Sequence, residues 1–439
     1  MNFKVILFLS ICISFTFCKN ETSNSKETTL PPNSNTAKLD EYFTALTSLK
    51  EFNGCVLVQQ NGEEIFKKAF NLTEQKDSSL YVTTASQFDV RSISKLMAKA
   101  SIIQLEQEGK IKRTDFLNKY IPDFPNGEKI TIEHLMYNQS GLPREYVDLQ
   151  QNEFDLSNEQ VMDLAKKQKL EFEPGTYSRY SNVGFQVLYY VIGQIANTSF
   201  SQNLYNIFFD RLQMDDSGGH FYADNSNLIK YAYGHELNDD GKIIAIKDFQ
   251  PSTFKMGKIY STLDDLMSFL NYIDKEPFVS KLKNKNGVIG HAGGTDGKRA
   301  YIHSNPNLKY KFVFLTNYDA IPFQQIMEDV QKILEGKPYE VPKEVNRIAI
   351  NLPQDVLKKY VGAYDFEEIE HMILEVKLEE GTLVVYQNGE NNGVLFPESE
   401  TVFFSDKKSA KSFEFRKNEK KSFDALMDFR GAKWEGVRL

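Results

Sequence analysis

Ser92-Ile93-Ser94-Lys95 is the stretch of this 439-residue chain from which we predict the fold. The apolar residues that follow it recur at helical spacing, and Gly109 is a typical residue to end a helix. We therefore expect a helix that starts at Ser92 and carries Lys95 in its first turn. A helix-start serine with a solvated lysine is the alternative, and Ser-x-x-Lys also begins at four other serines: Ser23, Ser252, Ser280 and Ser405.

The pairing of Ser92 with Lys95 suits nucleophilic catalysis. A serine hydroxyl is a weak nucleophile near neutral pH, so it needs a base within hydrogen-bond distance and a site that stabilises an oxyanion. The positive end of the helix dipole and burial both lower the pKa of a lysine in the first turn. The backbone N–H groups of that turn also face a nearby oxyanion. Ser92 is therefore the candidate nucleophile and Lys95 a candidate base.

Two further motifs follow along the chain. Tyr180-Ser181-Asn182 precedes a second predicted helix, at about residues 183–195, and lies in a loop from which a phenol can point into a cleft. A packed tyrosine and an Asn182 that only caps the helix are the alternatives. His291-Ala292-Gly293-Gly294 predicts a strand whose glycines let a substrate lie close to the backbone, with a turn histidine as the alternative.

In this order, the three motifs resemble those of the serine β-lactamase and penicillin-binding-protein superfamily. The similarity is to its class C-like branch of D,D-peptidases, D-aminopeptidases and esterases, and it covers about residues 39–337. It implies an α+β fold, an α/β sandwich with an antiparallel sheet and a helical subdomain. Connecting stretches that carry the same resemblance are 88–91, 107–111, 130–136, 140–143, 174–175 and 260–266.

The resemblance also implies roles for the site residues. Ser92 would form an acyl-enzyme, and Lys95 and Tyr180 would share the proton transfer in a way that the sequence does not divide between them. Asn182 would hold Lys95 or a substrate amide. The backbone N–H groups of Ser92 and Gly294 would bind the oxyanion, with Gly293 beside them on the strand.

Two positions depart from the family pattern. His291 stands where β-lactamases usually carry a lysine that meets the substrate carboxylate, which favours a peptidase or esterase over antibiotic hydrolysis. Tyr137-Asn138-Gln139 stands where the family often has a second histidine before Ser-Gly-Leu. We interpret this second departure as structural variation.

The N-terminus predicts export. Residues 1–17 hold Lys4 and then an apolar run that is too short to span a bilayer, which is typical of a signal peptide. Cys18 follows directly, and the segment resembles a bacterial lipoprotein signal in which this cysteine is acylated. Plain secretion with cleavage nearby and an uncleaved anchor are the alternatives. Residues 18–38 are polar and predict a flexible tether. We expect a protein of the bacterial periplasm or cell envelope, attached to a membrane through Cys18.

Residues 39–337 and 342–439 are predicted to form two domains. The first opens with a hairpin over residues 54–70, turning at Asn61-Gly62, and it contains a buried strand at 311–315. The second consists of short alternating runs between Gly-, Asn- and Lys-rich turns, which predicts a small all-β domain. This tail resembles the lipocalin-like domain that follows some family members, and the resemblance implies a barrel-like form.

Composition limits the partners. The net charge is −8, from 52 Lys+Arg against 60 Asp+Glu, so we expect no nucleic-acid partner. No His-Glu-x-x-His motif is present and Cys55 has no paired cysteine, so we expect no metal and no cofactor.

The predicted function is that of an exported serine hydrolase. Its partners would be small esters or amides and peptides of D-amino acids. A non-hydrolytic penicillin-binding-like sensor and an adhesion or scaffold lipoprotein are the alternatives, and a true β-lactamase is less favoured.

Overall fold

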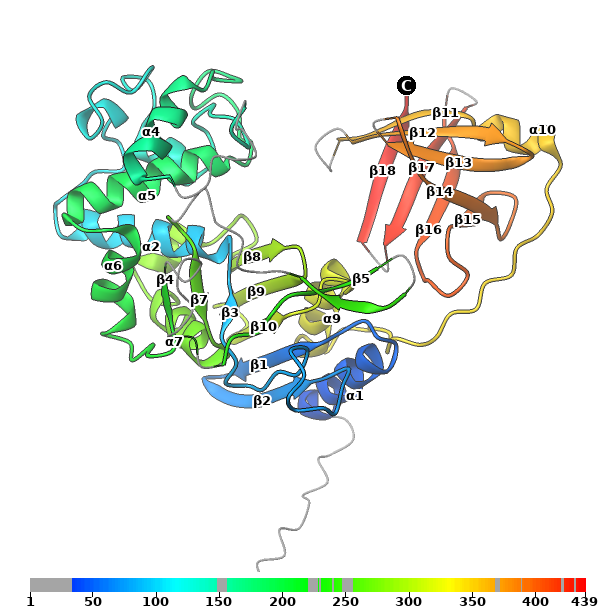
Figure 1. The fold of residues 1–439 in the computed structure, drawn as a ribbon, viewed down its shortest axis with the longest axis horizontal. Coiled ribbons are helices and arrows are strands. Elements are labelled where there is room, and N and C mark those ends of the chain that lie inside the picture. Colours follow the sequence, from blue (N-terminus) through cyan, green and yellow to red (C-terminus); the bar gives the residue numbers. More distant parts are fainter. Residues whose placement is uncertain are drawn as a thin grey trace, which may run out of the picture.

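A computed structural model describes residues 34–147, 156–219, 228, 230–238, 241–246, 256–367, 372–387, 389–419, 422–429 and 432–439. Figure 1 shows two bodies: a mixed body of helices and strands and, beside it, a barrel formed by the C-terminal strands. The predicted export signal and Cys18 lie outside the described residues. Within the described part of the chain, no helix has both the length and the apolar character needed to cross a membrane.

A five-stranded antiparallel sheet forms the centre of the first body, in the order β2-β1-β10-β9-β8. The predicted hairpin at 54–70 is confirmed as β1 and β2, and its two turn residues, Asn61 and Gly62, both have positive φ, as the tightest hairpin turns require. The strands of this sheet are β1 (Gly54–Gln60), β2 (Glu63–Phe70), β8 (Ile289–Thr295), β9 (Lys298–Asn305) and β10 (Tyr310–Thr316).

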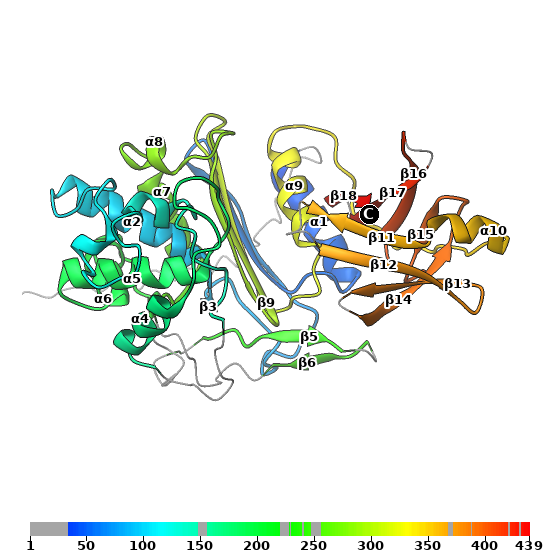
Figure 2. The same ribbon diagram turned by 90° about the horizontal axis from the view of Figure 1, so that it is seen from above.

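The two central strands are buried on both faces. Cys55 and Leu57 of β1 point into the core shared with α2, whereas Val56 and Val58 point into the core shared with α1 and α9. Strand β10 alternates in the same way, which explains why the predicted strand at 311–315 is apolar without interruption after Lys311. Figure 2 shows α1 and α9 on one side of the sheet, with α2 and α7 on the other. The helices of this body are α1 (Asn35–Ser48), α2 (Ile93–Gln107), α3 (Ile132–Met136), α4 (Asn158–Lys167), α5 (Asn182–Ala196), α6 (Phe200–Leu204), α7 (Leu263–Ile273), α8 (Phe278–Leu282) and α9 (Phe323–Leu334).

The N-terminal helix begins earlier than we expected. Residues 35–38, which we assigned to the end of the tether, form the first turn of α1, and the Ser34 hydroxyl caps it by accepting the N–H of Ala37. The polar composition of this turn hid the helix, because its buried side chains start only at Leu39.

Helices α2 and α5 confirm the two predicted helices that carry the motifs. Gly109 has a φ of +70° just after the end of α2, the left-handed conformation expected of a residue that terminates a helix. The short strands β3 (Phe88–Asp89), β4 (Gly218–Gly219) and β7 (Ile259–Ser261) form one small sheet, and β5 (His235–Leu237) and β6 (Ile243–Ala245) form a separate pair.

The C-terminal body is a closed barrel of eight antiparallel strands in sequence order, as the predicted barrel-like all-β domain requires. A short helix, α10 (Gln354–Leu357), precedes it. The strands are β11 (Gly362–Phe366), β12 (Met372–Glu379), β13 (Thr382–Gln387), β14 (Glu390–Pro397), β15 (Val402–Phe404), β16 (Ser412–Lys417), β17 (Phe423–Phe429) and β18 (Ala432–Arg438).

Aromatic side chains dominate the core of this barrel. The Tyr360 ring is fully buried, stacks on Phe415 with centroids 4.3 Å apart, and meets Phe403 and Phe423 edge to face. Its hydroxyl donates to the carbonyl of Glu400 at 3.0 Å. An eight-stranded barrel is just wide enough to be filled by side chains, and this one is packed around Tyr360.

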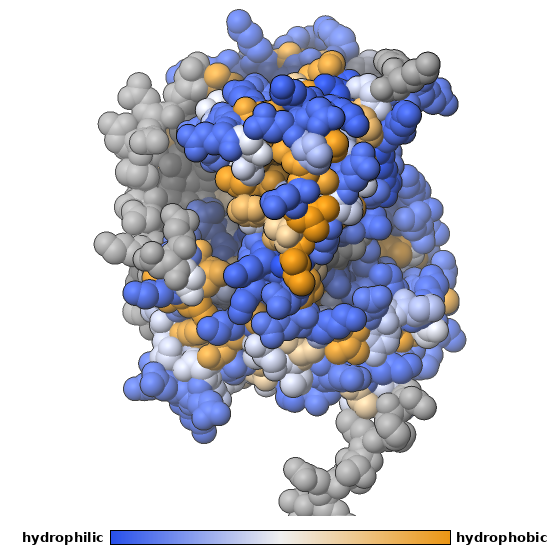
Figure 3. All heavy atoms as spheres, turned by 90° about the vertical axis from the view of Figure 1, so that its right-hand side faces the viewer, coloured by the Kyte–Doolittle hydropathy of each residue, from blue (hydrophilic) through white to orange (hydrophobic). Residues whose placement is uncertain are grey.

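The segment that enters the barrel is held by Arg347. Its guanidinium pairs with Glu398 and donates to the carbonyls of Ser409 and Ala410. Next to it, Ile348 is 76% exposed, and the N–H of Ile350 donates to Pro397 of β14. Figure 3 shows the barrel side of the molecule, which is mainly hydrophilic, with apolar side chains gathered in a band across the barrel.

Tyr360 tests the packing of the barrel. Tyr360→Ala should lower the free energy of unfolding of the barrel by about 3–5 kcal/mol, because the substitution leaves a cavity among three aromatic rings. Trp434 of β18 is the only tryptophan of the chain, so its fluorescence during denaturant unfolding reports on the barrel. The exposed control Ile348→Ala should change the free energy by less than about 0.5 kcal/mol. Equal effects of the two substitutions would contradict the packing.

Candidate active site

Ser92 lies at the N-cap of α2, but its side chain makes no capping bond. Its hydroxyl oxygen instead lies 2.9 Å from the Lys95 amine and 2.8 Å from the Tyr180 hydroxyl. Arg91, the residue before it, has a left-handed φ of +44°, a strained conformation for a residue other than glycine. Together, these contacts place Ser92 between the two groups that the sequence proposed as proton carriers.

Lys95 is buried in the first turn of α2, with only 6% of its surface exposed. Its pKa is lowered to about 7, mainly by burial and also by the positive charges of Lys258, Arg144 and Arg91, while the charge of Glu145 acts in the opposite direction. The amine also lies over the Tyr180 ring, 5.0 Å from its centroid. A large fraction of Lys95 is therefore neutral near physiological pH and able to accept a proton.

Tyr180 stands two residues before α5, and its hydroxyl is directed to Ser92. Burial raises the pKa of this phenol, although the hydrogen bond from Ser92 and the charge of Arg144 work against the increase. The phenol therefore keeps its proton at neutral pH. Of the two groups beside Ser92, only Lys95 has a pKa near neutrality.

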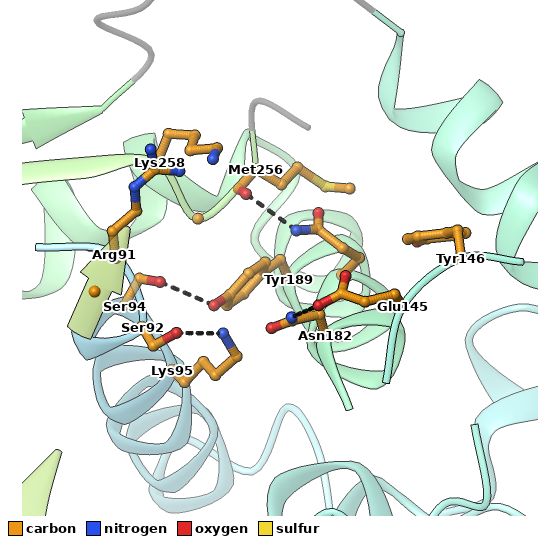
Figure 4. A pocket seen from close by; sticks show the side chains of 13 residues that line it. Arg91, Ser92, Ser94, Lys95, Glu145, Tyr146, Asn182, Tyr189, Met256 and Lys258 are labelled. Carbon is orange, nitrogen blue, oxygen red and sulfur yellow. Dashed lines mark hydrogen bonds between the residues drawn. The ribbon is translucent and has the colours of Figure 1, made fainter. Parts of the chain in front are cut away.

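Asn182 is the first residue of α5 and not its N-cap, which corrects the capping interpretation. The cap is Ser181, whose hydroxyl accepts the N–H of Gly184 at 2.8 Å and donates to the Pro143 carbonyl at 2.7 Å. A serine held by both bonds is the better cap. The Asn182 amide donates to Glu145 at 2.5 Å. Both residues line the pocket across from Ser92 (Figure 4).

Strand β8 brings the third motif to the start of α2. A Cβ on Gly293 would lie 2.2 Å from the Val90 carbonyl and 3.3 Å from the Ser92 nitrogen, so only glycine allows this approach. Gly294 lines the same pocket as Ser92. His291 lies further along β8 and borders a separate shallow cavity with Tyr301. Its pKa is lowered to about 3, mainly by burial and also by the nearby charges of Lys99 and Lys95, so His291 is neutral.

The pocket in front of Ser92 has a volume of about 220 Å³. Figure 4 shows Ser92 and Lys95 on one helix, with Asn182 and Glu145 across the opening. Its walls are polar and charged; besides Ser92, Lys95, Asn182 and Gly294, they contain Arg91, Ser94, Glu145, Tyr146, Gln186, Tyr189, Met256, Gly257 and Lys258.

Sequence reasoning missed several of these wall residues. The Tyr189 hydroxyl bonds to Ser94 at 2.9 Å, and its position on the apolar stripe of α5 gave no sign of this. Lys258 lies beside Arg91 in the pocket wall (Figure 4), and burial lowers its pKa to about 8. Glu145 and Lys258 stand outside every motif, so no spacing in the sequence indicates them.

The other Ser-x-x-Lys copies do not form comparable sites among the described residues. Ser280 lies in α8, exposed, with its hydroxyl donating to Pro277, and Ser405 is exposed next to β15. Ser23 and Ser252 lie outside the described residues. Cys55 is buried, and burial raises the pKa of its thiol, as expected of a structural cysteine. The described residues contain no cluster of His, Cys, Asp and Glu that could hold a metal ion.

A mixed body with an antiparallel sheet and a buried serine–lysine pair at a helix start defines a class of protein, the β-lactamase-like serine hydrolases. The family model described as Beta-lactamase matches residues 40–286, more than half of the chain. The chain therefore belongs to the Beta-lactamase family.

Known relatives extend the similarity beyond the matched family segment. Penicillin-binding protein 4* of Bacillus subtilis is 25% identical over 91% of this chain and 98% of its own length. A teichoic acid D-alanine hydrolase of Staphylococcus aureus is 28% identical over 61% of this chain and 64% of its own length. Among solved structures, the octameric penicillin-binding protein homologue from Pyrococcus abyssi aligns with a TM-score of 0.62 at 18% identity, covering 92% of this chain and 100% of that one. This last match shows that the overall fold is shared.

The pKa of Lys95 sets a pH dependence for acylation. Below about pH 7 the amine is protonated and cannot accept the Ser92 proton, so kcat/KM should fall as the pH drops through that value and level off above it. The measurement is kcat/KM for a nitrophenyl ester from pH 5 to pH 9. Lys95→Arg, which keeps the charge at every pH, should abolish the reaction. A flat profile would show that Lys95 is not the base.

Gly293 tests the contact between β8 and α2. Gly293→Ala forces a Cβ against the Val90 carbonyl, so the strand must move away from Ser92. We expect covalent labelling of Ser92 by a fluorophosphonate probe to slow by about 100-fold. The control is Ala292→Ser, an exposed position on the same strand, which should label at the normal rate. Normal labelling of Gly293→Ala would contradict the requirement for glycine.

Proposed function

We propose that this protein is an exported bacterial serine hydrolase that forms an acyl-enzyme on Ser92 and acts on D-alanyl esters or on amides and peptides of D-amino acids. One observation carries the proposal: the Ser92 hydroxyl lies within 2.9 Å of a buried lysine whose pKa is about 7. This arrangement activates a serine without a histidine. The names of two relatives, a penicillin-binding protein and a teichoic acid D-alanine hydrolase, support the substrate class.

In the first step, Ser92 Oγ attacks the carbonyl carbon while its proton passes to the neutral amine of Lys95. The negative charge that forms on the carbonyl oxygen is held by the N–H groups of Ser92 and Gly294. The bond to the leaving alcohol or amine then breaks, and that group takes the proton from Lys95 through the Tyr180 hydroxyl.

In the second step, water attacks the acyl carbon. Lys95 accepts one proton of this water, the acid is released, and Ser92 Oγ regains its proton. Tyr180 remains a phenol throughout, because its raised pKa keeps it protonated. Lys95 is thus the base in both steps, and Tyr180 is the donor that connects it to the leaving group.

His291 supports an esterase or peptidase over a β-lactamase. Its pKa of about 3 keeps the side chain neutral, so this position of β8 offers no cation to a substrate carboxylate. Asn182, held by Glu145, remains in our proposal the amide that meets the substrate at the far wall.

In this proposal the predicted export signal and Cys18 direct the enzyme to the cell envelope. Residues 1–17 would direct the chain across the membrane, and acylation of Cys18 would retain it there. Residues 19–33 would then separate the folded body from the lipid surface.

A substrate panel on the chain from Cys18 onwards tests the function. We expect turnover of a D-alanyl ester or a D-alanyl-D-alanine peptide, weaker turnover of the matching L-alanyl compound, and loss of both in Ser92→Ala. Full activity should persist in a chelator. Hydrolysis of a chromogenic cephalosporin in preference to these substrates would instead identify a β-lactamase.

The same panel separates the enzyme from a sensor. A Ser92 acyl adduct that forms within seconds but persists for hours, as seen by mass spectrometry, would show a binding protein built on a hydrolase fold. Absence of any adduct on Ser92 would refute the assigned nucleophile.

A further inference from the structure

The loop that carries Tyr180 is held by the three residues that follow α3. The hydroxyl of Ser178 donates to the Tyr137 carbonyl at 3.0 Å, and the N–H of Gly175 donates to the Gln139 carbonyl at 2.8 Å. Between these two lies Asn138, the middle residue of the stretch that we interpreted as structural variation. The loop is therefore attached to residues 137–139 on both sides of this residue.

Asn138 accepts hydrogen bonds from the backbone N–H groups of Arg179 and Ser181, the two residues next to Tyr180. The N–H of Arg179 donates to its carbonyl at 2.9 Å, and the N–H of Ser181 donates to its side-chain oxygen Oδ1 at 3.1 Å. Asn138 thus holds the peptide group between Tyr180 and Ser181 and the peptide group between Ser178 and Arg179. The Tyr180 hydroxyl lies at the far end of a long side chain, so a small backbone rotation at this point would move it out of reach of Ser92.

Helix α3 and Tyr137, which precede Asn138, are held in place by hydrogen bonds. Helix α3 begins with a reciprocal capping arrangement between Thr131 and His134, and the hydroxyl of Tyr137 donates to the Lys281 carbonyl at 2.9 Å. The imidazole of His134 lies so close to Gly175 that a Cβ there would stand 2.9 Å from its Nε2. Asn138 therefore projects from a rigid corner of the fold.

We propose that Asn138 is a positioning residue that holds Tyr180 at hydrogen-bond distance from Ser92. The inference rests on the proposed role of Tyr180 in proton transfer. Asn138 touches neither the substrate nor the reacting atoms. It acts by accepting the backbone N–H groups of Arg179 and Ser181.

The conformation of Asn138 explains the choice of residue. Its φ of +59° is left-handed, which asparagine, aspartate and glycine tolerate better than other residues. Of these three, only asparagine and aspartate have a side-chain oxygen that can accept the N–H of Ser181. Asn138→Gly and Asn138→Asp are therefore a matched pair: both suit the backbone, and only the second keeps the acceptor.

Amide hydrogen exchange tests the clamp without any substrate. In the peptide covering residues 178–182, exchange should be faster in Asn138→Gly than in the unsubstituted protein, because the Ser181 N–H loses its acceptor. Asn138→Asp should exchange as the unsubstituted protein does. Equal exchange in all three proteins would overturn the clamp.

A double-mutant cycle tests the link to Tyr180. With a fluorophosphonate probe, Asn138→Gly should slow labelling of Ser92 by about 10- to 100-fold, and Asn138→Asp should restore the rate. In a Tyr180→Phe background, Asn138→Gly should cost less than about twofold, because the group it positions is already absent. An equal loss in both backgrounds would show a general structural role and overturn the proposal. If Ser92 takes up no probe in the unsubstituted protein, the proposed function fails, and the exchange measurement still decides the clamp.

Discussion

The burial of the Lys95 amine is the constraint on which this site depends. Eleven of the fifteen residues of α2 are buried, because the helix packs between the central sheet and α5. A charged ammonium in such surroundings costs several kcal/mol, so the proton is held weakly and the pKa falls to about 7. The packing that stabilises the helix therefore also produces the base. A lysine at the same spacing on a solvated helix would keep its charge and could not activate Ser92.

Backbone contacts hold the three motifs together, although they are far apart in the sequence. Gly293 meets the carbonyl of Val90 directly, and Asn138 holds the amides on both sides of Tyr180. Such contacts allow little movement, because the backbones of Gly293 and Val90 cannot rotate apart and Asn138 accepts its two bonds through its own carbonyl and a short side chain. Hydrogen bonds of 2.8 and 2.9 Å to a single hydroxyl oxygen require this degree of positional control.

Much of the fold could be predicted from local patterns, and the errors have physical reasons. The hairpin at 54–70, the helix from Ser92 and the β-rich tail were predictable, because alternation and helical spacing record burial directly. Capping was the alternative role for Asn182, because asparagine favours that position, but Ser181 is the cap and gains two hydrogen bonds there. Asn138 was missed because its function depends on a partner more than forty residues away, which no local pattern records. The places of Lys258 and Glu145 in the pocket were not predicted for the same reason, because the fold alone brings them there.

The core of the barrel is packed differently from the core of the first body. In the first body, packing leaves a polar pocket at the edge of the core, whereas the barrel core is occupied by rings such as Tyr360 and Phe415 at stacking distance. A side chain at the centre of that packing cannot also line a ligand cavity. The matches to penicillin-binding protein 4* and to the Pyrococcus structure extend over more than nine-tenths of the chain, so both bodies belong to the shared architecture. Large apolar side chains that this part of the chain leaves exposed, such as Ile348 before the barrel and Phe396 on β14, therefore lie on its outer surface and not around the ring-filled core.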